Sequence, residues 1–222
     1  MPEPQAPPPD VVAIFADADL LVLEKPSGLL CVPGRGPDKS DCLSQRASQR
    51  WPGALVVHRL DQATSGLLVM ARNPEAQRLL SAAFAEQRVH KRYQAIVHGR
   101  PHDGPAAQAD GGWNTISLPI AADWPRRPLR VIDHALGKAS QTQWRILGPA
   151  QGSDATRLEL APLTGRTHQL RVHLSAIGHA ILGDALYGDA ASAPRLLLHA
   201  TRMAFAHPRT AEPLQFTSAP EF

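Results

Sequence analysis

The chain has 222 residues, 43% of them hydrophobic, and a formal net charge of +3. That length and apolar content suffice for one large domain or two small ones. The two cysteines disfavour a disulfide framework or a zinc knuckle, and the lack of any run of about 18 apolar residues excludes a membrane-spanning helix. The mildly basic charge permits a polyanionic partner without requiring one.

The N-terminal segment, residues 1–10, is rich in proline and lacks the apolar core of a signal peptide. We expect it to be a disordered tail. No linker divides the remainder, so residues 11–222 are expected to form one domain.

In the first half of the chain, short apolar runs bounded by turn-forming residues predict strands. The expected strands cover residues 11–15, 20–26, 54–61 and 66–72. Two helices are expected between and after them. One covers residues 40–50 with Ser40 as its N-cap, and the other covers residues 74–88 with Pro74 at its first position.

The second half continues with strands and one further helix. The expected strands cover residues 90–99, 141–147, 156–163, 194–208 and 213–220. Residues 99–128 are rich in Pro, Gly and Asp and predict a long surface excursion. Residues 165–178 predict a helix that stops at Gly178. Because strands dominate and hairpins are frequent, the fold class is α+β with a mainly antiparallel sheet.

The stretch VHRLDQATSGLL, residues 57–68, places charges in an apolar run. If the strand reaches Asp61, alternation puts Arg59 and Asp61 on one face at the strand end. Buried charges are costly unless they are paired or used in chemistry. Taken alone, the motif favours a structural ion pair over a reactive carboxylate.

The stretch LTGRTHQLRVHL, residues 163–174, places Arg166 in the first turn of the expected helix. The helix dipole opposes a cation there, so Arg166 either gains from a nearby carboxylate or phosphate or points to solvent. His168 and His173 are five residues apart, the wrong spacing for two metal ligands on one helical face.

The stretch HKRYQAIV, residues 90–97, carries Lys91 and Tyr93 on one strand face and Arg92 on the other. A strand tyrosine is usually core filler. The basic neighbours also suit a nucleobase held between a stacking ring and phosphate contacts. Further along, Asp184 follows Gly183 and is expected to form an Asx turn rather than to act in catalysis.

Together these motifs resemble those of the RluA-type RNA pseudouridine synthases. The matching segments, in the order of that family, are EKPSGLLCVPGR, HRLDQATSGLLVMAR, KRYQAIVHG, LTGRTHQLRVHLSAIGHAILGDALYG and RLLLHA. The chain most resembles a dual-specificity branch of this family. The similarity lies in the short length, in the segments VPGR and DWPRRP, and in the lack of room for an N-terminal S4 domain. That branch acts on a tRNA anticodon stem-loop and a 23S rRNA loop. Ser117 departs from the acidic residue expected before Leu-Pro.

The resemblance implies a single bilobed catalytic domain with flanking helices, a mixed, mainly antiparallel sheet and a central RNA-binding cleft. It implies that Asp61 is the catalytic aspartate and that Arg166 pairs with it. Tyr93 would stack on the target uracil, Leu198 would line the pocket, and Arg59 would fill the space left by the flipped base. Weaker RNA-backbone contacts are expected from a set of basic side chains: Arg35, Lys91, Arg92, Arg126, Arg127 and Arg171.

The implied reaction breaks the N1–C1′ bond of a flipped uridine, turns the uracil and rejoins it through C5. Nothing is oxidised and no group leaves the RNA, so neither a cofactor nor a metal is expected. The detached uracil delocalises its negative charge, which accounts for one motif carboxylate where glycosidases use two. Asp61 could attack the ribose as a nucleophile or remove a proton from it as a base, and the sequence leaves both open.

Two other classes of function were weighed. A non-catalytic RNA-binding protein or RNA chaperone fits the basic segments, but a carboxylate such as Asp61 would repel phosphates in its cleft. A nucleoside hydrolase requires a second positioned carboxylate or a calcium-binding cluster of aspartates, and the sequence pattern indicates neither. We therefore predict an isomerase acting on structured RNA in the cytoplasm, and a monomer, because no apolar dimer stripe is evident.

Overall fold

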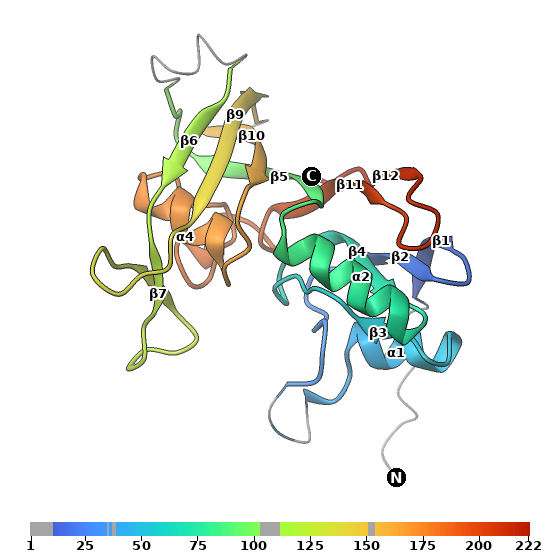
Figure 1. Cartoon of the computed structure of the whole chain (residues 1–222). Coiled ribbons are helices and arrows are strands. Elements are labelled where there is room, and N and C mark those ends of the chain that lie inside the picture. The colour runs from blue at the N-terminus through green and yellow to red at the C-terminus, as the bar shows by residue number, and fades with distance from the viewer. Residues whose placement is uncertain (1–10, 35, 37–38, 103–111, 151–153) are drawn as a thin grey trace.

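The computed structural model describes residues 11–34, 36, 39–102, 112–150 and 154–222 (Figure 1). The tail predicted over residues 1–10 lies outside this part of the chain. One large sheet contains these strands: β1 (Val12–Ala16), β2 (Leu20–Lys25), β3 (Leu55–Val56), β4 (Ser65–Ala71), β5 (His90–His98), β6 (Asn114–Ser117), β9 (Gln141–Pro149), β10 (Ala155–Pro162), β11 (Leu198–Ala206) and β12 (Pro213–Thr217). A separate hairpin consists of β7 (Ile120–Ala122) and β8 (Arg130–Ile132). The helical elements are α1 (Leu43–Arg50), α2 (Pro74–Ala85), α4 (Gln169–Ala176) and the short 3₁₀ helix η2 (Ala190–Ser192).

The ten-stranded sheet has the order β1-β2-β4-β11-β5-β10-β9-β6, with β12 paired to β11 and β3 paired to β4. The pair β4–β11 is parallel, and the other pairs of the described sheet are antiparallel. This arrangement confirms the predicted α+β class with a mainly antiparallel mixed sheet. None of the described helices is long and apolar enough to cross a membrane.

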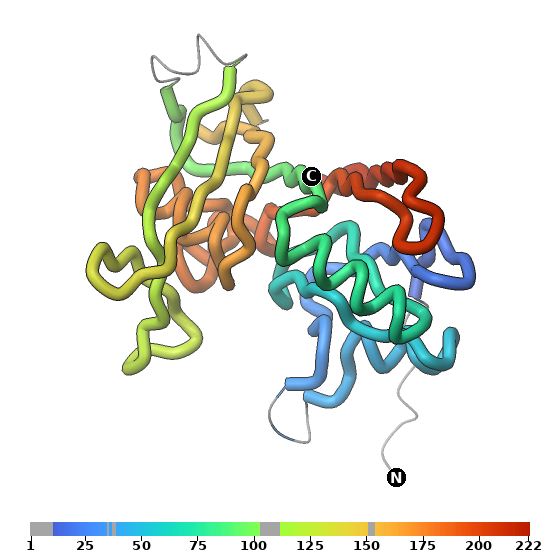
Figure 2. The backbone as a smooth tube through the Cα atoms, viewed as in Figure 1, coloured from blue at the N-terminus to red at the C-terminus, as the bar shows by residue number. Residues whose placement is uncertain are grey.

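The sheet bends into two halves, and β5 and β11 run between them (Figure 2). One half contains β1, β2 and β4 with α1 and α2, and the other contains β6, β9 and β10 with α4 (Figure 1). The buried core is continuous across both halves, because a single apolar cluster includes Leu21 of β2 and Leu158 of β10. Segments far apart in sequence therefore face one another where the halves meet.

Gly66 allows the two halves to join closely. The parallel pairing of β4 with β11 matches Ser65 to His199 and Gly66 to Ala200. Gly66 has φ +107°, and a Cβ at this position would lie 2.4 Å from the carbonyl oxygen of Ala200. Only glycine tolerates both the conformation and the approach, which explains the glycine of the TSG motif.

Two helices begin later than predicted. α1 begins at Leu43 after Cys42, so Ser40 precedes the helix and does not cap it. α4 begins at Gln169, so Arg166 belongs to the preceding turn rather than to the helix.

Two strand predictions also need correction. The strand expected over residues 54–61 ends at Val56, and the segment with Arg59 and Asp61 is irregular. The excursion expected over residues 99–128 contains β6 and β7, while residues 103–111 lie outside the described part.

Candidate active site

Side chains, rather than a strand partner, hold the segment that carries Asp61. The thiol of Cys31 donates to the carbonyl oxygen of Leu60 at 3.1 Å and accepts from the N–H of Leu60 at 3.2 Å. The fully buried ammonium of Lys25 donates to three backbone carbonyls, including that of Gln62 at 2.9 Å. Burial lowers the pKa of Lys25 to about 8. These bonds fix the backbone on both sides of Asp61.

Arg171 approaches Asp61 from the other half of the molecule, in the first turn of α4. Its Nη1 lies 3.5 Å from Oδ2 of Asp61, and its side chain is 5% exposed. The same guanidinium donates to both carboxylate oxygens of Asp184, at 2.6 and 2.8 Å. Burial would raise the pKa of Asp184, but the hydrogen bonds from Arg171 outweigh it and keep this pKa below its usual value. A buried Arg–Asp pair thus presents its cation to Asp61.

The expected pair of Arg166 with Asp61 is not formed. Nε and Nη2 of Arg166 both donate to the carbonyl oxygen of Ala139 at 3.3 Å, and the side chain is exposed. Because α4 starts after Arg166, the first arginine of the motif stays at the rim. Arg171, predicted as an RNA-backbone contact, is buried instead and takes the place beside Asp61.

A cavity of about 500 Å³ lies beside Asp61, within the size range of small-ligand sites. Its lining includes all five residues assigned by resemblance: Arg59, Asp61, Tyr93, Arg166 and Leu198. Tyr93 and Leu198 lie on the neighbouring strands β5 and β11 and are both largely buried. Burial raises the pKa of the Tyr93 hydroxyl, so the ring stays neutral at physiological pH.

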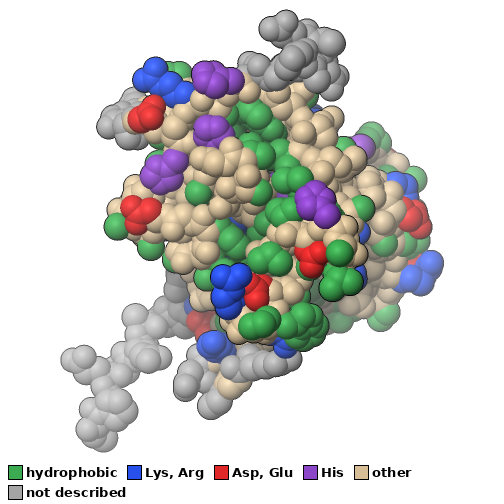
Figure 3. All heavy atoms as spheres, turned by 90° about the vertical axis from the view of Figure 1, so that its left-hand side faces the viewer, with side chains coloured by type: hydrophobic (Ala, Val, Ile, Leu, Met, Phe, Trp, Pro, Cys, Tyr) green, Lys and Arg blue, Asp and Glu red, His purple; other side chains and the backbone are tan. Residues whose placement is uncertain are grey.

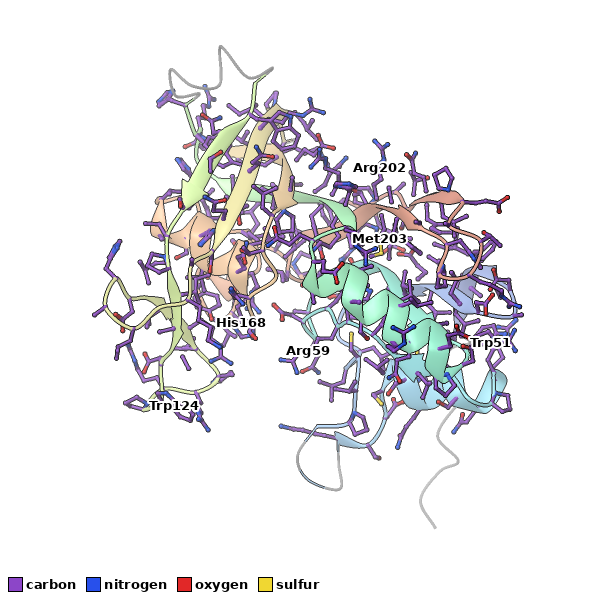
Figure 4. All side chains as sticks on the ribbon, viewed as in Figure 1. Trp51, Arg59, Trp124, His168, Arg202 and Met203 are labelled. Atoms are coloured by element: carbon purple, nitrogen blue, oxygen red, sulfur yellow. The ribbon has the colours of Figure 1, made fainter. Side chains whose placement is uncertain are left out.

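A second cavity of about 470 Å³ meets the first at Asp61. The residues that line both cavities are Arg59, Leu60, Asp61, His168 and Arg171. Figure 4 shows Arg59 and His168 facing one another from the two halves. Asp61 therefore lies at the junction of two hollows, with space on both sides.

His168 and Tyr187 complete this site, and the sequence interpretation missed both. Nε2 of His168 lies 3.9 Å from Oδ1 of Asp61, and its Nδ1 lies 2.7 Å from the hydroxyl of Tyr187. Asp184 accepts from the N–H groups of Leu186 and Tyr187, so the predicted Asx turn exists, but Asp184 also binds Arg171. The position of Arg171 between Leu170 and Val172 was the available signal for a buried ion pair.

Comparison with known proteins identifies the family of the chain. Residues 19–176 match the family described as RNA pseudouridylate synthase. The chain belongs to this family. The dual-specificity RNA pseudouridine synthase RluA of Yersinia pestis is 40% identical over 215 residues, which cover 96% of this chain and 100% of that protein. The protein of the same name from Escherichia coli (strain K12) is 41% identical over 217 residues, covering 96% and 95%.

A solved structure leads to the same family. Human RNA Pseudouridylate Synthase Domain Containing 1 superposes with a TM-score of 0.76 at 30% identity, covering 96% of this chain and 84% of that one. The predicted isomerase class and α+β fold are therefore confirmed for this synthase, and the catalytic interpretation is favoured over a non-catalytic RNA-binding protein.

Strand alternation on β5 places the basic residues of this synthase on opposite faces of the strand. Lys91 and Tyr93 line the first cavity, as predicted for one strand face. Arg92 points to the other side, where its guanidinium lies 4.7 Å from the ring centroid of Trp113, so it is not part of the cavity. Arg35, also predicted to bind RNA, lies outside the described residues.

The β7–β8 hairpin carries the other predicted RNA contacts. Arg126 is paired with Asp123 at 2.6 Å, and Arg127 lies 3.4 Å over the ring centroid of Trp124. Trp124 is 70% exposed, and Pro128 of the same loop lines the second cavity. Figure 4 shows Trp124 at the projecting end of this hairpin. On the outer face of the half that contains β6, β9 and β10, the described basic, acidic and histidine side chains are scattered and form no continuous basic patch (Figure 3).

One cluster in the synthase has metal-ligand chemistry. Ligand atoms of Asp17, Asp19 and His207 lie within 4.8 Å of one another, outside both cavities. His207 uses Nε2 toward Asp17 at 2.9 Å and accepts the N–H groups of Arg209 and Thr210 on Nδ1. Arg209 pairs with Asp19. The cluster thus connects the β1–β2 turn to the β11–β12 turn, and the atoms that could bind a metal are already used in hydrogen bonds and ion pairs.

Proposed function

We propose that this synthase converts a uridine to pseudouridine in a tRNA anticodon stem-loop, in a 23S rRNA loop, or in both, with Asp61 as its catalytic residue. The substrate proposal rests on relatives that are named dual-specificity RNA pseudouridine synthases and match nearly the whole chain. The catalytic proposal rests on the position of Asp61.

Asp61 is the single acidic residue among the described residues that line either cavity, and basic side chains surround it. A carboxylate among basic groups opposes phosphate binding, so its place at the junction is best explained by chemistry. Arg171 offsets part of this charge, because its Nη1 lies 3.5 Å from Oδ2 of Asp61. This single carboxylate at the meeting point of two cavities is the observation that carries the proposal.

The surroundings suit the reaction. A flipped uracil enters the first cavity and stacks on the ring of Tyr93, with Leu198 beside it. Asp61 then either bonds to C1′ as the N1–C1′ bond breaks or removes a proton from the ribose. The uracil turns and C5 bonds to C1′ as the bond between Asp61 and C1′ breaks or, on the second route, as Asp61 returns the proton to the ribose. C5 loses its proton and N1 gains one, so the product is an isomer. Tyr93 and Leu198 place apolar surface beside the base, which limits access of water that would otherwise capture the ribose intermediate.

The catalytic role is tested by Asp61→Asn with RNA labelled with tritium at C5 of uridine. We expect tritium release to fall to background while RNA binding is retained. Full activity of Asp61→Asn would overturn the catalytic role. If the wild type modified no RNA and Asp61→Asn bound RNA more tightly, the non-catalytic RNA-binding function would replace the proposal.

The RNA target is tested by carbodiimide mapping of pseudouridine in RNA from the source organism with and without the gene. We expect loss of a site in a tRNA anticodon stem-loop, a 23S loop, or both. Loss confined to other 23S sites would refute the dual-specificity assignment.

The synthase is also proposed to act as a cytoplasmic monomer. The two cysteines, Cys31 and Cys42, are buried and free, which suits a reducing compartment. Light scattering after size exclusion tests the oligomeric state, and fractionation of the source cells tests the location.

A further inference from the structure

His168 adopts a backbone conformation that needs an explanation. Its φ of +57° and ψ of 16° lie in the left-handed region, which residues other than glycine adopt rarely. It is the N-cap residue of α4, yet its side chain makes no capping hydrogen bond. Strained residues of this kind persist where the surrounding structure enforces them, and they concentrate at functional sites. The conformation places the imidazole in the lining of both cavities.

The two ring nitrogens of His168 have different neighbours. Nε2 lies 3.9 Å from Oδ1 of Asp61, whereas Nδ1 lies 2.7 Å from the hydroxyl of Tyr187. Arg171 lies 3.5 Å from the other oxygen of Asp61, Oδ2. Each oxygen of the Asp61 carboxylate therefore faces one nitrogen donor from the opposite half.

The hydroxyl of Tyr187 favours a proton on Nε2 of His168. This hydroxyl accepts the N–H of Arg130 at 2.9 Å, so its own proton is available to donate. Within the described part of the chain, Nδ1 of His168 is the acceptor placed to receive it. A proton-accepting Nδ1 leaves the imidazole proton on Nε2, the nitrogen that faces Asp61. Burial also lowers the pKa of His168, which favours the neutral ring.

Tyr187 links both groups that flank Asp61. Its ring lies 5.1 Å from the guanidinium carbon of Arg171, and its N–H donates to Oδ1 of Asp184 at 3.1 Å. Asp184 in turn holds Arg171. His168, Tyr187, Asp184 and Arg171 therefore form one connected support around the Asp61 carboxylate.

We propose that His168 is a positioning residue: oriented by Tyr187, its Nε2–H closes onto Oδ1 of Asp61 when RNA fills the cavity and, with Arg171, fixes the rotation of the carboxylate. This inference rests on the catalytic role of Asp61 proposed above. The distances of 3.5 and 3.9 Å suit a site that tightens around its substrate, since catalytic hydrogen bonds are often long in free enzymes.

Variants at both positions test the proposal, with the tritiated RNA that the wild type modifies. Tyr187→Phe removes the hydroxyl but keeps the ring beside Arg171. His168→Gln keeps an N–H donor at about the reach of Nε2, and His168→Leu removes it. His134→Gln is the control, because His134 is exposed and lines neither cavity.

We expect single-turnover rates to fall about tenfold in Tyr187→Phe and about 100-fold in His168→Leu, as for outer partners of reactive groups. His168→Gln should recover part of that loss. RNA affinity should stay within about twofold of wild type in all variants, since the contact is made to Asp61 and not to RNA. His134→Gln should match wild type in both measurements.

Nitrogen-15 NMR of the histidine rings gives a readout that does not depend on activity. We expect the neutral Nε2–H form of His168 near neutral pH, and a shift of its Nδ1 resonance in Tyr187→Phe as the hydrogen bond is lost. An Nδ1–H ring, a charged ring, or wild-type rates in His168→Leu would overturn the inference. A fully active Asp61→Asn would instead remove the catalytic role on which it rests.

Discussion

Arg171 lies between two carboxylates, 2.6 Å from Asp184 and 3.5 Å from Asp61. The shorter contact fixes the guanidinium through a pair of hydrogen bonds, and the longer one leaves Asp61 free to face the cavity. The arginine that supports the proposed catalytic carboxylate is thus itself supported from behind by a buried aspartate.

This relationship predicts different results for the two arginines of the GRTHQLR motif. Arg171→Lys loses the forked contact with Asp184 and leaves that buried carboxylate poorly paired, so we expect activity to fall at least about 100-fold with reduced thermal stability. Arg166→Lys should lower activity by less than about tenfold, because Arg166 is exposed and bonds a backbone carbonyl. Single-turnover tritium release compares them, and equal losses would contradict the pairing seen here.

Tyr93 should act through its ring rather than its hydroxyl. The ring is 8% exposed in the cavity wall, where a uracil can stack on it. Tyr93→Phe keeps the stacking face, and we expect its rate to stay within about fivefold of wild type. Tyr93→Leu should lose about ten- to 100-fold, the range expected for loss of base–aromatic stacking. A rate for Tyr93→Phe as low as that for Tyr93→Leu would assign the role to the hydroxyl instead.

Trp124 should contribute to RNA affinity. Its exposed ring lies under Arg127 at the end of a hairpin that borders the second cavity, an arrangement that suits a nucleobase or a phosphate. We expect Trp124→Ala to weaken RNA binding about tenfold with an unchanged single-turnover rate at saturating RNA.

Val12→Ala serves as the control for Trp124→Ala, because Val12 is 58% exposed on the edge strand β1 and lines neither cavity. Wild-type tryptophan fluorescence should also change on RNA binding, and most of that change should disappear in Trp124→Ala. If Trp124→Ala bound RNA as tightly as Val12→Ala, the end of the β7–β8 hairpin would not be part of the RNA-binding face.

His199 should contribute to the pH dependence of stability. It is 3% exposed, contacts Ser65 at 2.9 Å and Ser218 at 2.8 Å, and burial lowers its pKa to about 4. An unfolded histidine titrates near 6.5, so between about pH 6.5 and 4 the unfolded chain binds a proton that the folded chain does not. The free energy of unfolding should therefore be fully maintained above about pH 6.5 and fall as the pH drops toward 4.

His199→Gln tests this pH dependence by urea unfolding across the same pH range. The slope of the unfolding free energy against pH should become shallower by the amount that corresponds to about one proton taken up on unfolding. This change is expected even if the variant is less stable at every pH. Some slope should remain, because burial also lowers the pKa of His58 to about 3. An unchanged slope would show that His199 does not carry the effect.

Most strands could be predicted from the sequence because they depend on local pattern, and five residues of the first cavity could be named because their motifs resemble those of the family. Alternation on β5 placed Lys91 and Tyr93 on one face and Arg92 on the other, as the structure has them. The same rule failed for residues 57–61, because the bonds of Leu60 to the thiol of Cys31 replace a strand ladder there. Cys31 is distant from this segment in sequence, so no local pattern predicts the contact.

The sequence by itself determined the family, the fold class and the identity of the candidate carboxylate, because motifs and apolar periodicity are written along the chain. Only the tertiary structure decided which arginine faces Asp61 and that His168 and Tyr187 accompany it. The start of α4 sets which side chains turn inward, and the joining of β4 with β11 brings the two halves of the sheet together. Contacts between groups about a hundred residues apart depend on that packing, which no stretch of sequence encodes alone.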